Sequence, residues 1–112
     1  MTLAELRHKA AQNTLSFQET IAFVQANYQY RPSRFLNGDV VNDAGKNEGS
    51  CKIFALAKLN QFSEAETLQC FGDYYRVDVL QHPEASDHAN IRQFMKTGWT
   101  GIQFDQEALL QN

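Results

Sequence analysis

The residues best suited to chemistry lie in one short stretch, where a turn-rich segment leads into a predicted helix. Cys51 is in the first turn of that helix, next to Lys52. The positive end of the helix dipole and a neighbouring ammonium group both favour the thiolate, which is a nucleophile. This pattern predicts a cysteine-dependent hydrolase or transferase. The alternative is a small thiol that fills space beneath the turn, because unpaired cysteines are among the most buried residue types.

A candidate base for such a nucleophile lies later in the chain. His88 follows Asp87 at the start of another predicted helix, and thiol hydrolases pair their cysteine with a histidine that a third group orients. In this hypothesis Cys51 attacks, His88 takes its proton and Asp87 orients the imidazole. Backbone amides of residues 50–52 would stabilise the oxyanion. The order of the residues fits this scheme, but the sequence does not give the distance between Cys51 and His88.

A second hypothesis is a binding site for a small polar or anionic molecule. The loop 42–50 and the helix starting near Asp87 both concentrate hydrogen-bonding side chains, and we expect them to meet at one shallow pocket. The predicted ligand-binding residues are Asn47, Glu48, Ser50, Tyr75, Arg76, Asn90, Arg92 and Trp99. A purely structural alternative stays open, in which Asp87 caps the helix and Arg92 pairs with Asp73 or Asp78. The glycines near residue 45 do not match a P-loop.

A third hypothesis is a protein-interaction surface with exposed aromatic anchors. Tyr74, Tyr75 and Trp99 are its candidates, since aromatic residues and arginine are enriched at the centres of interfaces. The alternative is that these rings belong to the core, because aromatic residues make up 12% of this short chain.

Composition narrows the classes of partner. The 112 residues carry 10 Lys and Arg against 13 Asp and Glu, a formal charge of -3, so we expect no nucleic-acid partner. No apolar run is long enough to span a bilayer, and no secretory signal is visible, which predicts a cytoplasmic protein with unpaired thiols. His82, Asp87 and His88 lack the spacing of a metal motif, so neither a metal nor a cofactor is predicted.

The elements that must position these residues are mostly helical. Residues 16–19 and 63–66 each read as a capping box, in which a serine and a glutamate close a helix start. An apolar face at residues 17, 21, 24 and 28 predicts an amphipathic helix that ends before Pro32. Further helices are predicted at 3–12, 50–59, 63–71 and 74–80. A last long one is capped by Ser86 or Asp87 and closes at Gly98.

The remaining segments predict a small amount of extended structure. Asn37-Gly38 between arms 34–36 and 39–41 predicts a type I′ hairpin. Residues 99–104 are expected to be extended or looped, and residues 105–110 to form a last short helix. The fold class is therefore mainly α (α-rich α+β): a compact single domain, residues 1–112, of five or six short helices with a β-hairpin near residues 34–41.

Several ordered motifs together resemble one known family. The motifs are residues 47–52 (NEGSCK), 70–76 (CFGDYYR), 87–92 (DHANIR) and the pair Gly98-Trp99. They resemble the HopJ type III effector family over nearly the whole chain. The resemblance implies a family named for proteins that plant pathogens deliver by type III secretion, with no defined biochemical activity. Type III export uses a poorly ordered, Ser-rich N-terminus, whereas the first residues here are predicted to be helical.

Overall fold

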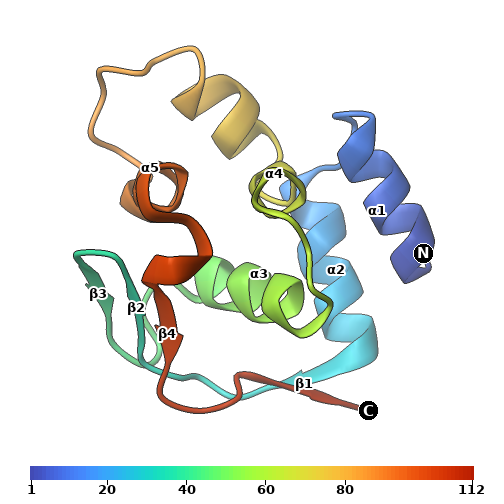
Figure 1. Cartoon of the computed structure of the whole chain (residues 1–112). Coiled ribbons are helices and arrows are strands. Elements are labelled where there is room, and N and C mark those ends of the chain that lie inside the picture. Colours follow the sequence, from blue (N-terminus) through green and yellow to red (C-terminus); the bar gives the residue numbers. More distant parts are fainter.

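The computed structural model describes residues 1–112, and Figure 1 shows how its elements are arranged. A π-helix, η1 (Tyr74–Val79), and a 3-10 helix, η2 (Gly98–Gly101), accompany the α-helices and short strands. The α-helices are α1 (Leu3–Ala11), α2 (Phe17–Asn27), α3 (Glu48–Leu59), α4 (Glu64–Gln69) and α5 (Ala89–Thr97). The strands are β1 (Tyr28–Tyr30), β2 (Phe35–Asn37), β3 (Val40–Asn42), β4 (Ile102–Phe104) and β5 (Leu109–Gln111). The α-rich α+β fold class is confirmed.

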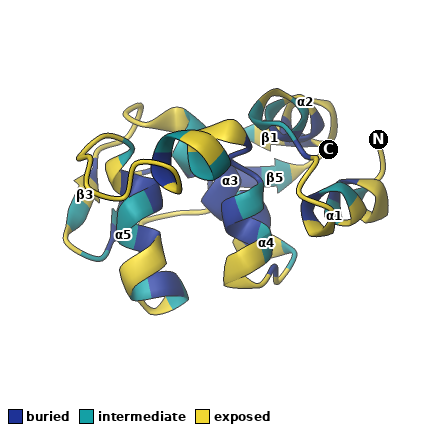
Figure 2. Cartoon of the chain, turned by 90° about the horizontal axis from the view of Figure 1, so that it is seen from above, coloured by how far each residue is buried: buried dark blue, intermediate teal, exposed yellow.

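Helix α3 forms the centre of the hydrophobic core. It buries five of its residues, and the ring of Phe54 lies 5.0 to 6.0 Å from those of Phe35, Phe71 and Phe94. Figure 2 shows the buried residues concentrated on α3 and on the surfaces that surround it. Burying one such ring contributes about 1.5–3 kcal/mol to folding. Because Phe54 packs with rings from three other segments, α3 is the central element of the core.

Two small antiparallel sheets cover one side of this core. One has the strand order β3-β2-β4, and the other pairs β1 with β5. Both sheets therefore join an early strand to one near the C-terminus: Phe35 pairs with Phe104, and Tyr30 with Leu109. These long-range pairings fix the C-terminal segment, residues 102–111, against the rest of the fold (Figure 1).

Most predicted helices are present, and two of the three capping boxes were predicted. Ser16 and Ser63 each accept from the amide three residues on, while the glutamate there accepts from the cap. Thr2 and Glu5 form a third box that the prediction missed. The segment 74–80 is helical but of the π type. No helix of the structure is long and apolar enough to cross a membrane.

Three local predictions were wrong. Phe35 pairs with Asn42, so the hairpin turn is Gly38-Asp39 rather than Asn37-Gly38, and only Gly38 has a positive φ, as in a type II′ turn. The C-terminal helix predicted at 105–110 is absent, because residues 109–111 pair with β1 instead. The cap of α5 is neither Ser86 nor Asp87 but His88.

We predict that Gly72→Ala destabilises the fold more than Gly45→Ala. Both glycines have a left-handed backbone, where an added Cβ costs about 1–2 kcal/mol. At Gly72 the new carbon would also lie 2.6 Å from the backbone nitrogen of Phe17, whereas at Gly45 nothing lies within 4 Å. Urea denaturation should therefore show the larger loss of unfolding free energy for Gly72→Ala. Equal losses would contradict the packing described here.

Candidate functional site

A cavity of about 360 Å³ opens where the starts of α3 and α5 meet. Its walls combine aromatic rings, small residues and hydrogen-bonding side chains from six separate segments. The lining residues are Phe17, Val40, Asn47, Gly49, Ser50, Phe71, Tyr74, His88, Ala89, Asn90 and Ile91. The volume is at the lower end of the range for small-molecule sites, about 300–1,000 Å³.

The two helices that begin at this cavity have unusual N-termini. Helices α1, α2 and α4 each begin with a complete capping box. Helices α3 and α5 have no side-chain cap, and their N-cap residues, Asn47 and His88, both have left-handed backbones. N-cap residues usually have extended backbones, which let the side chain reach the first amides. The amides of the first turns of α3 and α5 are thus left without a side-chain partner beside the cavity.

A network of asparagine side chains holds the cavity walls together. Asn42 Oδ1 accepts from Asn47 Nδ2 at 2.7 Å and from Asn90 Nδ2 at 2.8 Å. Asn90 Oδ1 in turn accepts from Asn42 and Asn37, both at 3.1 Å. Asn37, Asn42 and Asn90 are buried, and the Oδ1 of Asn37 has no partner. The network ties β2, β3 and the loop before α3 to the start of α5.

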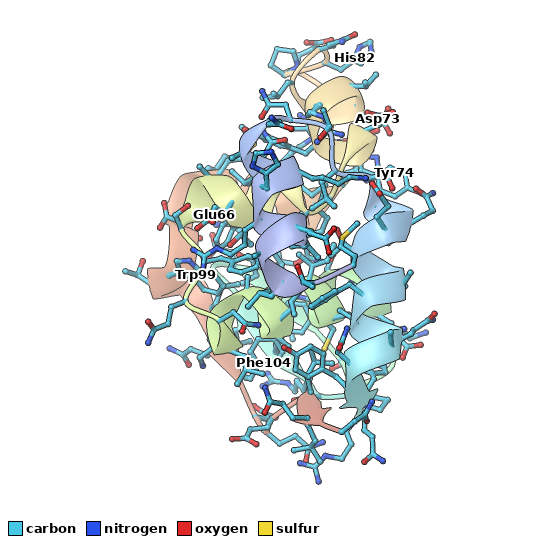
Figure 3. All side chains as sticks on the ribbon, turned by 90° about the vertical axis from the view of Figure 1, so that its right-hand side faces the viewer. Glu66, Asp73, Tyr74, His82, Trp99 and Phe104 are labelled. Carbon is cyan, nitrogen blue, oxygen red and sulfur yellow. The ribbon has the colours of Figure 1, made fainter.

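His88 is held in place by a carboxylate and an aromatic ring. Its Nε2 lies 3.0 Å from Asp78 Oδ2, and its ring centroid lies 5.1 Å from that of Tyr74. The rings of Tyr74 and Phe17 pack edge to face with their centroids 5.0 Å apart, and Tyr74 is 40% exposed. Figure 3 shows Tyr74 on η1, toward the start of α2. These rings give the cavity one aromatic wall.

Comparison with known proteins identifies the family. The profile described as "HopJ type III effector protein" matches residues 2–109. The chain belongs to the HopJ family. A solved structure described as "unknown function protein VPA0580" has 47% sequence identity and a TM-score of 0.95, covering 100% of this chain and 95% of that one. None of the curated proteins compared with this chain matches it.

In this HopJ protein, the two arginines predicted to bind a ligand are used elsewhere. Arg92 donates to Asp87 Oδ1 at 2.8 Å and to the backbone oxygens of Asp78, Pro83 and Asp87. Its hydrogen bond lowers the pKa of the Asp87 carboxyl. Arg76 donates to the backbone of Leu15. Both guanidinium groups thus donate hydrogen bonds to the backbone of loops, and neither arginine lines the cavity.

The environment of Cys51 differs from that of a nucleophile. Cys51 is 1% exposed and lies on the core side of α3, where Sγ is 3.8 Å from the carbonyl oxygen of Ser33. Burial raises the pKa of the Cys51 thiol, although the positive charge of Lys52 acts in the opposite direction. Cys51 does not line the cavity that contains His88, and its amide is bonded to Asn47. The structure therefore does not bring the Cys51 thiol and the His88 imidazole together in one cavity.

The other predicted site residues divide into two groups. Asn47, Ser50, His88 and Asn90 line the cavity, whereas Glu48, Tyr75 and Trp99 do not. The indole of Trp99 donates to the carbonyl of Phe62 at 3.0 Å and packs on Phe94. Figure 3 shows Trp99 and Tyr74 on different sides of α1, with Tyr74 toward the start of α2.

Sequence reasoning missed several residues of this HopJ site. Asn37 and Asn42 are not among the predicted binding residues, although both are buried in the network. Phe17 is predicted on the apolar face of a helix and Phe71 at the end of another, yet both line the cavity. The one available signal was the number of asparagines between residues 37 and 47, which exceeds what a single turn needs.

We predict that Asn42→Ala lowers the unfolding free energy by roughly 1–3 kcal/mol, because it leaves the buried Asn90 amide without its acceptor. Asn112→Ala, at the exposed C-terminus, is the control and should change stability by less than about 0.5 kcal/mol. The double variant Asn42→Ala/Asn90→Ala should lose less than the sum of the single losses, since the two side chains bond to each other. Strict additivity in urea denaturation would contradict a connected network.

We predict that iodoacetamide labels neither Cys51 nor Cys70 in the folded protein. Burial raises the pKa of the Cys51 thiol and raises that of Cys70 to about 12. Peptide mass spectrometry across a pH series should detect both adducts only after unfolding, with His88→Ala unchanged. Rapid native labelling of Cys51 with a midpoint below about 8.5, lost in His88→Ala, would restore the thiol-enzyme hypothesis.

Proposed function

We propose that this HopJ protein binds a small polar molecule in the cavity between the starts of α3 and α5. The observation that carries the proposal is the pair of uncapped helix N-termini beside one cavity. Replacing an N-cap serine, threonine, asparagine or aspartate by alanine costs about 1 kcal/mol, so two open N-termini are a stability cost that a ligand can offset. Helices α1, α2 and α4 are fully capped, including α2, whose first residue, Phe17, lines the same cavity.

The side chains around these amides support the same proposal. Asn47 uses only its Nδ2 group within the chain, so its Oδ1 is an available acceptor. Ser50 offers a hydroxyl at the same helix start, and Asn90 is held by the network with one face toward the cavity. A small molecule could therefore exchange hydrogen bonds with both helices at once. The buried network pre-organises these groups, which reduces the entropy lost on binding.

The proposal predicts saturable binding at this cavity. A fragment library screened by ligand-observed NMR should yield ligands whose addition shifts the backbone amide signals of Gly49, Ser50, Ala89 and Asn90. The double variant Asn47→Ala/Ser50→Ala should weaken them about tenfold, the effect of losing roughly 1.4 kcal/mol of hydrogen bonding. Ser86→Ala, in an exposed loop outside the cavity, is the matched control.

Two results would contradict the proposal. One is the absence of any fragment that shifts these four amides. The other is a set of fragments that bind only at the groove near Ala55 and Leu59, on the far part of α3.

A further inference from the structure

The charges around the cavity disfavour an ionic ligand. No lysine, arginine, aspartate or glutamate is among the lining residues. The two helix N-termini supply about half a positive charge each, but Glu48 in the first turn of α3 and Asp78 beside His88 oppose them. Among the lining residues an anion would therefore meet no lysine or arginine, and the imidazole of His88 already faces Asp78 at 3.0 Å. A cation would meet the positive ends of two helices and no carboxylate among the lining residues. Both transfers are costly.

The shape and chemistry of the walls favour a flat ring. Tyr74, His88 and Phe17 present neighbouring rings, and aromatic pairs stack or meet edge to face. The volume of about 360 Å³ suits a molecule of one or two rings.

The polar groups at the two helix starts offer both donors and acceptors. The first amides of α3 and α5 donate, while Asn47 Oδ1 and the Ser50 hydroxyl can accept. A carboxamide or lactam edge presents a carbonyl and an N–H side by side, so it matches such a pair without carrying charge.

We infer that the cavity selects an uncharged planar ring that carries a carboxamide or lactam edge, with the ring on Tyr74 and the polar edge on the starts of α3 and α5. The inference rests on the proposed function and specifies the class of ligand. It excludes both a phosphate- or carboxylate-bearing ligand and an amine.

Four probes of nearly equal size test this inference. Benzamide is neutral and planar, benzoate is its anionic counterpart, benzamidine is its cationic counterpart, and cyclohexanecarboxamide keeps the amide but loses the flat ring. Titrating each probe against the ¹⁵N-labelled full chain at neutral pH gives a dissociation constant from the amide shifts of Gly49, Ser50, Ala89 and Asn90. Benzamide should bind at least about tenfold more tightly than each of the other three, a difference of roughly 1.4 kcal/mol.

Two variants separate the ring from the edge. Tyr74→Leu should weaken benzamide while leaving cyclohexanecarboxamide nearly unchanged, because only the flat ring stacks. Asn47→Ala should reduce the preference for benzamide over benzoate. Ser86→Ala should change neither. Urea denaturation of each variant shows whether it remains folded.

The outcomes distinguish the inference from the proposed function. Tighter binding of benzoate, benzamidine or cyclohexanecarboxamide at these amides would overturn the inference and keep the cavity as a binding site. Equal binding of all four probes would also overturn it. If benzamide does not bind while other fragments shift the four amides, the inference is overturned and the cavity remains a binding site. If no probe or fragment shifts those amides, the inference and the proposed function fail together.

Discussion

The arrangement of the site depends on the hydrogen bonds that Asn42 makes with Asn47 and Asn90. Asn42 ends β3, Asn47 begins α3 and Asn90 lies in the first turn of α5. Buried amides must be paired, because leaving one unpaired costs about 1–3 kcal/mol. This requirement fixes where the two helices start relative to the hairpin. The cavity is the space that this constraint creates, and its polar groups are held in position by the same bonds.

The helix starts show how stability is distributed. The capping boxes of α1, α2 and α4 stabilise those helices locally. Helix α3 lacks a cap but buries Phe54 among three other rings, so packing rather than capping stabilises it. Helix α5 likewise buries Ile91 and Phe94. The core thus permits both N-termini to remain open, and membership of the HopJ family by itself assigns no chemistry to them.

Local features were predictable from the sequence, and features set by distant contacts were not. The boxes at Ser16 and Ser63 depend on residues three positions apart, so their pattern is visible in the sequence. The turn at Gly38 was misplaced by one residue, because Asn37 bonds to Asn90 rather than occupying the turn. The strand at 109–111 was mistaken for a helix, because its pairing partner lies about 80 residues earlier. In both cases the deciding partner was far away in the chain.

The candidate site also contains features that the sequence predicts and features that it does not. The sequence placed loop 42–50 and the start of the helix near Asp87 at one pocket, and Asn47, Ser50, His88 and Asn90 do line one cavity. Their ligand stays a prediction. Ser50 lines the cavity, whereas Cys51, the next residue along the helix, faces the core. Burial there raises the pKa of the Cys51 thiol and so opposes the thiolate that the helix dipole favours. The roles of Arg76 and Arg92 could not be predicted, because their partners include backbone oxygens that are distant in the chain.

A high-resolution crystal structure of the unliganded protein tests the central claim most directly. The claim is that the first amides of α3 and α5 lie beside one cavity without side-chain caps. Ordered water should occupy that cavity within about 3 Å of the amide nitrogens of Gly49, Ser50, Ala89 or Asn90. A structure in which side chains cap both helices, or in which the aromatic wall closes onto them, would contradict the account.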